Sequence, residues 1–126
     1  MSKTAVTSPE LAAPVGPYSQ AIEVDGFLYM SGQVGQDSAT GKLTAGGVIA
    51  ETEQLFLNVA ALLRTASMSF DSVISVRIFV TRMEDYPAIN AIYARQFSAP
   101  FPARTTVCVV ALPLGASVEM DLIARA

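Results

Sequence analysis

The sequence predicts an α+β domain in which two helices pack on one face of a mixed β-sheet. Three observations support this fold class: short runs of alternating apolar residues, two longer stretches with helical spacing, and the order of these segments along the chain. That order reads β-β-(β)-α-β-α-β-β, where the bracketed strand is the least regular. Strand–helix–strand units with crossovers of one hand place both helices on the same face. A length of 126 residues is typical of one domain, so we expect a single domain spanning residues 1–126.

The first part of the chain predicts an irregular segment followed by a hairpin. Residues 1–17 contain several prolines and alanines without periodicity, and we expect no regular structure there. Residues 19–24 and 27–31 are strand-like and flank an Asp-Gly pair, which is a strong signal for a tight hairpin turn. The loop that follows has a turn at its centre, with two short strands expected near Val34 and Leu43.

Residues 48–66 and 85–97 have the spacing of amphipathic helices. The apolar stripe of the first helix consists of Val48, Leu55, Val59, Leu62, Leu63 and Ala66, and that of the second consists of Ile89, Ile92, Tyr93 and Phe97. Polar residues lie largely off the first stripe, namely Glu51, Glu53, Asn58 and Arg64. Thr44 is a candidate for the cap of the first helix.

Residues 73–81, 103–111 and 117–124 are the remaining predicted strands, and each alternates an aliphatic set with a mixed set. If the aliphatic sets face the helices, the opposite face carries Arg77, Phe79, Arg104, Thr106, Cys108, Val110, Glu119, Asp121 and Ile123. Such a face is too apolar to stay open to water and too polar for a sealed core. We therefore expect it to pack against other subunits, with a ligand site at a subunit boundary.

The composition supports a subunit interface and excludes several kinds of site. Hydrophobic residues make up 52% of the chain and charged residues 15%, which is apolar for a soluble monomer. The net charge is −3 and there is no Lys/Arg run, so nucleic acid and anionic membranes are not expected partners. The absence of histidine excludes imidazole catalysis and His-ligated metals, and a single cysteine excludes an internal disulfide and structural zinc.

The chain also lacks the signals that would direct it to a membrane. Its start has no apolar secretory segment, and its longest apolar run has eight residues, from Val107 to Leu114. Together with the single cysteine, these features lead us to expect a soluble, cytoplasmic protein.

Arg104 and Glu119 are the leading candidates for chemistry. The guanidinium of Arg104 can bind a carboxylate through two parallel hydrogen bonds and stays charged when partly desolvated. Glu119 lies on the same predicted sheet face, where its carboxylate could position a water and transfer a proton. The alternative is structural: Arg104 pairs with Glu119 or Asp121 of a neighbouring strand. Arg77 is a rival anion receptor, although its surroundings do not resemble a prepared pocket.

Several other residues have both a functional and a structural interpretation. The hydroxyl of Tyr18 could reach a pocket or plug a core edge, and Asn90 could bind a ligand or simply be exposed. Ser31 and Gly32 end a strand where glycine allows close approach to the backbone, or where the chain merely turns. Cys108 is expected to be a buried, inert thiol.

A set of short motifs resembles the RidA (YjgF) family, the reactive-intermediate imine deaminases. In chain order they are Gly16-Pro17-Tyr18-Ser19-Gln20, Ser31-Gly32-Gln33, Thr40-Gly41, Asn90-Ala91-Ile92-Tyr93, Phe101-Pro102-Ala103-Arg104 and Leu112-Pro113. The resemblance covers essentially the whole chain, and the ordered set is far more specific than any single motif. It implies a chorismate-mutase-like α+β fold, a homotrimer with three sites in the clefts between subunits, and no cofactor.

The resemblance also implies an activity. Members hydrolyse reactive 2-imino acids or their enamine tautomers, such as 2-aminoacrylate, 2-iminopropanoate and 2-iminobutanoate, to 2-keto acids and ammonia. Two alternatives stay open: a non-catalytic trimer that binds small carboxylates or other proteins, and a deaminase of a larger unsaturated amino acid such as an aminomuconate.

By position, the resemblance assigns roles to individual residues. It places the carboxylate-binding arginine at Arg104 and the water-positioning acid at Glu119. The implied substrate-binding residues are Tyr18, Ser31, Gly32, Asn90 and Thr106. The last of these is a departure, because archetypal members carry a cysteine there, although a threonine hydroxyl can still hydrogen-bond a ligand.

Overall fold

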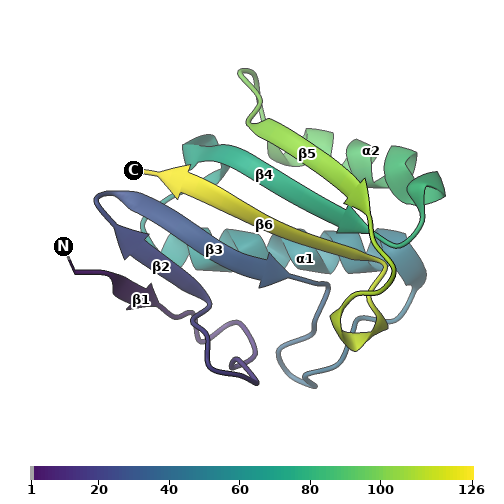
Figure 1. The fold of residues 1–126 in the computed structure, drawn as a ribbon, viewed down its shortest axis with the longest axis horizontal. Helices are drawn as coiled ribbons and strands as arrows, with labels where there is room; N and C mark the ends of the chain where they lie inside the picture. The colour runs from purple at the N-terminus through teal and green to yellow at the C-terminus, as the bar shows by residue number, and fades with distance from the viewer. Residues whose placement is uncertain (1) are drawn as a thin grey trace.

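The computed structural model describes residues 2–126 and contains one mixed sheet with two helices on one face (Figure 1). The elements are β1 (Thr4–Val6), β2 (Ala21–Val24), β3 (Phe27–Gln33), α1 (Gly47–Thr65), β4 (Val73–Val80), α2 (Tyr86–Gln96), β5 (Ala103–Cys108) and β6 (Val118–Arg125). Short 3₁₀ turns occupy η1 (Phe70–Ser72), η2 (Met83–Asp85) and η3 (Pro113–Gly115). The predicted α+β class and the placement of both helices on one face are confirmed.

The strand order in the sheet is β1-β2-β3-β6-β4-β5. The last strand, β6, lies between β3 and β4 and is antiparallel to both. After the α2 crossover, β5 returns parallel to β4 and forms one edge of the sheet. This order puts Arg104 on an edge strand and Glu119 on a central one.

The predicted hairpin is the β2–β3 pair, in which Val24 pairs with Phe27. Asp25 and Gly26 have φ values of 55° and 79°, the left-handed pair that a tight hairpin turn requires. After Met30, the register with β6 becomes irregular before Gln33, so β3 runs two residues beyond its predicted end.

Two expectations for short strands are wrong. Residues 4–6 form β1, which pairs antiparallel with β2 inside the segment predicted to be irregular. Three residues are too few to reveal alternation, so the neighbouring strand determines this structure. The strands expected near Val34 and Leu43 amount to a single bridge between Gln36 and Leu43.

The start of α1 also differs from the prediction. Its cap is Gly46, with a φ of 118° and no side-chain hydrogen bond, rather than Thr44. The backbone N–H of Thr44 instead donates to the carbonyl of Gly35 at 2.8 Å, which ties the loop to the end of the first hairpin.

Glu51 and Asn58 are buried in α1, although they lie largely off its apolar stripe. The Oε1 of Glu51 accepts a hydrogen bond from the backbone N–H of Ser117 at 2.7 Å. The Nδ2 of Asn58 donates to the carbonyls of Val34 and Gln36, at 3.3 and 3.0 Å. Both residues satisfy loop backbone groups that would otherwise be buried without partners, a role that helical periodicity does not reveal.

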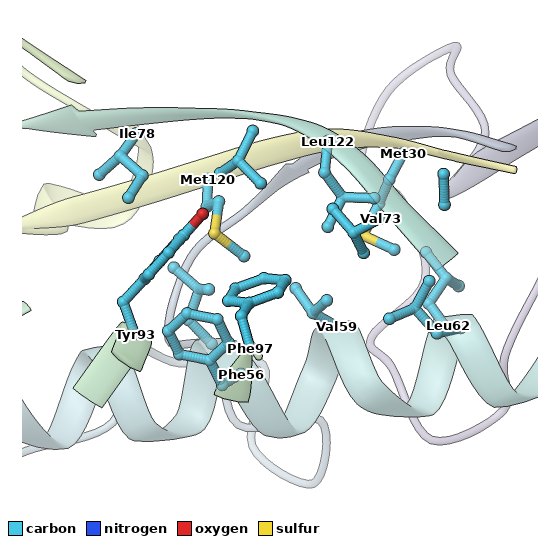
Figure 2. Close-up of a cluster of buried hydrophobic side chains, with 14 of the residues drawn as sticks. Met30, Phe56, Val59, Leu62, Val73, Ile78, Tyr93, Phe97, Met120 and Leu122 are labelled. Carbon is cyan, nitrogen blue, oxygen red and sulfur yellow. The ribbon is translucent and has the colours of Figure 1, made fainter. Parts of the chain in front are cut away.

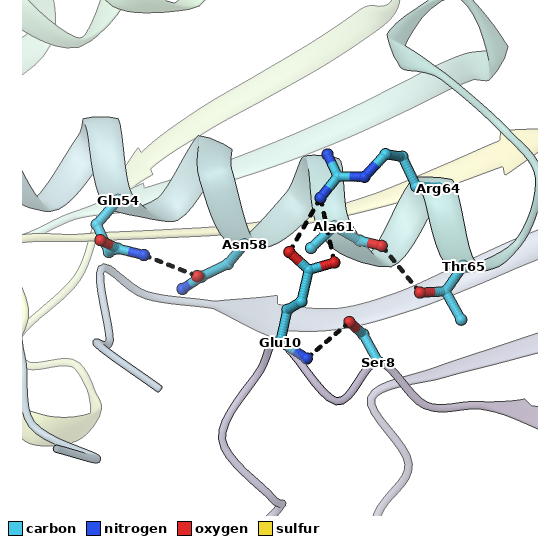
Figure 3. A network of polar contacts seen from close by, with 7 residues as sticks. All are labelled: Ser8, Glu10, Gln54, Asn58, Ala61, Arg64 and Thr65. Carbon is cyan, nitrogen blue, oxygen red and sulfur yellow. Dashed lines mark hydrogen bonds and ion pairs between the residues drawn. The ribbon is translucent and has the colours of Figure 1, made fainter. Parts of the chain in front are cut away.

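An ion pair between Glu10 and Arg64 joins the N-terminal segment to the outer surface of α1 (Figure 3). The Nη2 of Arg64 lies 3.2 Å from both carboxylate oxygens of Glu10, while Gln54 donates to Asn58 at 3.0 Å. The ion pair is well exposed, so we expect it to contribute less than about 1 kcal/mol to stability.

The core lies between α1, α2 and the face of the sheet that they cover, here called the helix-covered face (Figure 2). It contains the aliphatic set of β6, the predicted stripe of α1, and Val73, Val76, Ile78 and Val80 of β4. Ile74, predicted to be the first core residue of β4, is instead 47% exposed, because the register with β6 shifts between Val73 and Ser75. Phe56, Tyr93 and Phe97 meet edge-on or tilted beneath β4, with ring centroids 4.5–6.2 Å apart. Within residues 2–126, neither helix has both the length and the apolar character needed to cross a membrane.

The predicted faces of β5 are reversed. Its register pairs Arg104 with Val76 and Thr106 with Ile78, so both polar side chains lie on the helix-covered face. The opposite, open face carries Thr105 beside Arg77. No side chain of this edge strand is fully buried, so the apolar character of its two sets was no guide to which one meets the helices.

Candidate active site

The predicted site residues form two groups that one chain keeps apart. Tyr18, Gly32 and Glu119 line a cavity of about 220 Å³ where β3 ends and β6 begins. Asn90 and Arg104 line a shallow depression of about 340 Å³ beside β5. The register puts Glu119 on the open face and Arg104 on the helix-covered face. The expectation that Arg104 and Glu119 share one face of the sheet is therefore wrong.

Gly32 makes room for the side chain of Glu119 on the adjacent strand. A methyl group at residue 32 would lie 2.9 Å from Cδ and 3.2 Å from Cγ of Glu119, closer than ordinary packing allows. The close approach expected at this glycine is thus made by the carboxyl group itself. Because glycine has no side chain, the carboxyl group of Glu119 can lie directly over the backbone of residue 32.

The carboxylate of Glu119 is partly buried and has no hydrogen-bond or ion-pair partner among residues 2–126. Burial raises the pKa of Glu119 above its ordinary value of 4.5, and the nearby charge of Asp121 raises that pKa further. A carboxyl group whose pKa is moved toward neutrality can both accept and return a proton, which suits general acid–base chemistry.

Arg77 forms an ion pair with Asp121. This pair bears on two alternatives from the sequence: Arg77 as an anion receptor, and Asp121 as the partner of Arg104. The two residues are cross-strand partners, and the guanidinium donates from Nε at 2.9 Å and from Nη2 at 2.6 Å. Arg77 is therefore engaged and does not act as a rival anion receptor. The alternative in which Asp121 or Glu119 neutralises Arg104 is also wrong, because neither carboxylate pairs with it in the described part of the chain.

Arg104 is instead surrounded by aromatic side chains of α2. Its Nη2 donates to the hydroxyl of Tyr86 at 2.7 Å, and its Cζ lies 4.7 Å from the ring centroid of Tyr93. Stacking on a ring stabilises the cation without neutralising it. A half-buried guanidinium with no carboxylate partner among residues 2–126 is well suited to receive an external anion.

Sequence reasoning missed the role of Tyr86 and assigned Tyr93 only to the core. Both share a helix face with Asn90, because Tyr86, Asn90 and Tyr93 are spaced at i, i+4 and i+7. The Asn90 side chain, followed by Arg104, lowers the pKa of Tyr86. Burial raises the pKa of Tyr93, and Arg104 acts in the opposite direction. The polar helix face pointing at Arg104 was visible in the spacing, but only the correct face of β5 gives it meaning.

The remaining candidates have mixed outcomes. The hydroxyl of Ser31 donates to the carbonyl of Ser19 at 2.6 Å, so it joins two segments of the sheet edge. The Oγ1 of Thr106 is buried without a hydrogen-bond partner in the described residues, on the face that Arg104 shares. Cys108 is exposed at the end of the edge strand, which contradicts the expected buried thiol.

Comparison with known proteins decides the family. A family model described as Endoribonuclease L-PSP matches residues 9–126. The chain belongs to this family. A 2-iminobutanoate/2-iminopropanoate deaminase from Capra hircus is 39% identical over 119 residues, which cover 94% of this chain and 87% of the relative.

Solved structures agree with this L-PSP family membership along the whole chain. YyfA from Yersinia pestis, a protein of the Rid family, superposes with a TM-score of 0.95 at 38% identity and covers 99% of this chain and 100% of its own. RidA from an Antarctic Psychrobacter has a TM-score of 0.93 at 35% identity, with coverage of 98% and 99%. The predicted relationship to the RidA family is confirmed.

As an L-PSP family member, the chain presents two chemically complementary half-sites. One offers a cation in an aromatic setting at Arg104, and the other offers a partly desolvated carboxyl group at Glu119. The first suits recognition of a small carboxylate, and the second suits proton transfer involving water.

Proposed function

We propose that the protein hydrolyses 2-imino acids such as 2-iminopropanoate and 2-iminobutanoate, or enamine tautomers such as 2-aminoacrylate, to 2-keto acids and ammonia. The observation that carries this proposal is Arg104, a half-buried cation with no carboxylate partner in residues 2–126 and with aromatic walls. The activity named for the Capra hircus relative agrees with a small carboxylate substrate at this position.

We infer that the complete site forms between copies of the chain, as the family resemblance implies for a homotrimer. In this arrangement, Arg104 and Asn90 of one copy face Glu119 and Tyr18 of the next. The separation of the two half-sites within one chain supports this inference. So does the open sheet face, which exposes Tyr29 and Val107 at 46% and 42%, alongside the partly exposed Phe79 and Ile123.

The proposed chemistry needs orientation, one water and one proton transfer. The substrate carboxylate binds Arg104, which directs the imine carbon toward the carboxyl group of Glu119. The imine reacts in its protonated form. Glu119 accepts a proton from water as the water oxygen attacks the imine carbon, which gives a tetrahedral intermediate with a hydroxyl and an amino group. Glu119 then returns this proton to the amino nitrogen, the C–N bond breaks to release ammonia, and the hydroxyl proton passes back to Glu119 as the C=O bond of the 2-keto acid forms. Holding the reactants in place removes much of the entropic part of the barrier.

The activity is tested by generating 2-iminobutanoate with a pyridoxal-phosphate dehydratase and following keto-acid formation. The wild type should accelerate hydrolysis, and Arg104→Ala should lose most of that acceleration, on the order of a hundredfold. Arg64→Ala is the matched control, because its guanidinium pairs with Glu10 on the outside of α1, away from both half-sites. Equal acceleration by wild type and Arg104→Ala would reject the proposal.

The alternatives give different results in the same assay. A non-catalytic carboxylate-binding trimer would bind ligand through Arg104 without turnover and without dependence on Glu119. A deaminase of larger unsaturated amino acids would turn over an aminomuconate in preference to 2-iminobutanoate. The family description names an endoribonuclease, but a net charge of −3 does not favour binding of a polyanion. The cytoplasmic location stays a prediction.

A further inference from the structure

Tyr86 is the first residue of α2, and its hydroxyl meets the guanidinium of Arg104 from the helix side. We propose that Tyr86 is a positioning residue for Arg104: it selects which edge of the guanidinium receives the ligand carboxylate, and it makes that binding depend on the phenol staying neutral. The inference rests on the carboxylate-binding role of Arg104 in the proposed function and adds a residue that this function did not require.

The argument begins with the geometry of the guanidinium. A carboxylate can form two parallel hydrogen bonds with either of two edges of the guanidinium. One edge is formed by Nε and Nη2, and the other by Nη1 and Nη2. Nη2 takes part in both edges and uses a different hydrogen for each. Because one Nη2 hydrogen is donated to Tyr86 at 2.7 Å, only one edge keeps both of its donors for a ligand.

The surroundings of Arg104 make Tyr86 the group that fixes this choice. The Tyr93 ring supports the flat face of the guanidinium, with its centroid 4.7 Å from Cζ, but a ring face does not select an edge. The Tyr93 hydroxyl is buried without a hydrogen-bond partner in residues 2–126. Tyr86 is the one hydrogen-bond partner of the Arg104 side chain in the described part of the protein. Removing its hydroxyl frees the guanidinium to turn over the Tyr93 ring.

The same contact couples carboxylate binding to the ionisation of Tyr86. The groups that act on the phenol are Asn90, one turn further along α2, and Arg104 from β5, and both lower its pKa below the ordinary value of 10.0. Tyr93 faces the same guanidinium from α2, and its pKa is raised. As pH rises through the pKa of Tyr86, a phenolate forms beside Arg104 and competes with the ligand for its positive charge. Carboxylate affinity should therefore fall on the alkaline side.

The test is calorimetric titration with 2-oxobutanoate, a 2-keto acid, between pH 7 and pH 10. At pH 7, Tyr86→Phe should raise Kd roughly threefold to tenfold, the loss expected for one oriented hydrogen bond. On the alkaline side, wild type should lose affinity while Tyr86→Phe keeps its own. Thr65→Val removes a hydroxyl from the last turn of α1, outside both half-sites, and should behave as wild type. Phenylalanine preserves the ring, and equal melting temperatures confirm intact folding.

Each outcome bears on the inference. Equal affinity of wild type and Tyr86→Phe, with the same alkaline loss, overturns it. Failure of the wild type to bind 2-oxobutanoate also overturns it, because Arg104 then holds no small carboxylate. Imine turnover measured on the same proteins separates the two proposals. If the Kd values follow the expected pattern but no imine is turned over, Tyr86 has the proposed role and the deaminase activity is rejected. If imine is turned over but Tyr86→Phe binds 2-oxobutanoate like wild type at every pH, the deaminase activity stands and the role of Tyr86 is rejected.

Discussion

At the scale of single residues, the proposed chemistry depends on two charged side chains, Arg104 and Glu119, that have no ion-pair partner in the described residues. The sequence left a carboxylate as an equally plausible neighbour of Arg104, but its neighbours in the structure are aromatic rings. The side chain of Glu119 lies over Gly32 and forms no ion pair in the described residues. The candidates themselves were accessible from the sequence, because charged residues in apolar strands are conspicuous. Their partners were not, because Tyr86 and Tyr93 acquire their roles only through the register of β5.

The contact between Gly32 and Glu119 predicts a specific intolerance. Gly32→Ala should displace the Glu119 carboxyl group and lower the turnover of 2-iminobutanoate, with little loss of stability because the end of a flexible side chain can move aside. Denaturant unfolding checks that the fold is intact. Wild-type turnover in Gly32→Ala would contradict the account.

The raised pKa of Glu119 predicts a pH-dependent cost of keeping this carboxylate. Because the folded-state pKa exceeds the unfolded value of 4.5, the contribution of Glu119 to stability is most favourable below pH 4.5 and is lost as pH rises through the folded pKa. Glu119→Gln removes that loss, so its Tm should exceed that of wild type at pH 7 and match it at pH 4. The gain should be small because the group is partly solvated, and turnover should be abolished. A lower Tm at pH 7 would count against this description of the site.

At the scale of elements, burial on one side made a segment predictable. The stripe of α1 and the aliphatic set of β6 are confirmed, since both meet the core. The aliphatic set of β4 is confirmed from Val76 onward, but its first member, Ile74, is exposed, because the register with β6 shifts between Val73 and Ser75 and Val73 takes the buried position. β5 was misassigned because an edge strand has no fully buried face, and β1 was missed because three residues show no period. The burial of Glu51 and Asn58 could not be predicted from helical periodicity, because their hydrogen-bond partners are loop backbone groups distant in sequence.

The corrected face of β5 makes a prediction about Thr106. Its buried Oγ1 has no hydrogen-bond partner in residues 2–126, and such a group costs about 1–3 kcal/mol relative to a satisfied one. Thr106→Val keeps the shape and removes the polar atom, so the free energy of unfolding should rise by up to about 1 kcal/mol. Thr105→Val, on the exposed opposite face, should change it little. A clear loss of stability in Thr106→Val would show that the hydroxyl has a partner.

At the scale of the whole molecule, the fold explains why Arg104 and Glu119 lie apart within one chain. The α+β architecture, the hairpin and both helices followed from patterns in the sequence. The separation of Arg104 from Glu119 did not, because it depends on which side of β4 an edge strand presents. An exposed apolar sheet face beside two incomplete half-sites is consistent with assembly into a larger unit.

Assembly through the open face predicts the effect of charge there. Val107→Lys places an ammonium group on this face and should shift the protein toward monomer and lower its activity. Leu57→Lys makes the same change at an exposed position of α1 and should leave the assembly intact. Light scattering at micromolar concentration measures both. A wild-type monomer, or equal dissociation of the two variants, would rule out the open face as the interface.

The shared active site is tested most directly by mixing two inactive variants. Arg104→Ala and Glu119→Gln, each inactive alone, are unfolded together, refolded at equal amounts, and assayed with 2-iminobutanoate. If each site takes Arg104 from one copy and Glu119 from its neighbour, random assembly restores both residues at about a quarter of the sites. The account predicts recovery of about that fraction of wild-type activity. Activity that stays at the level of the separate variants would contradict it.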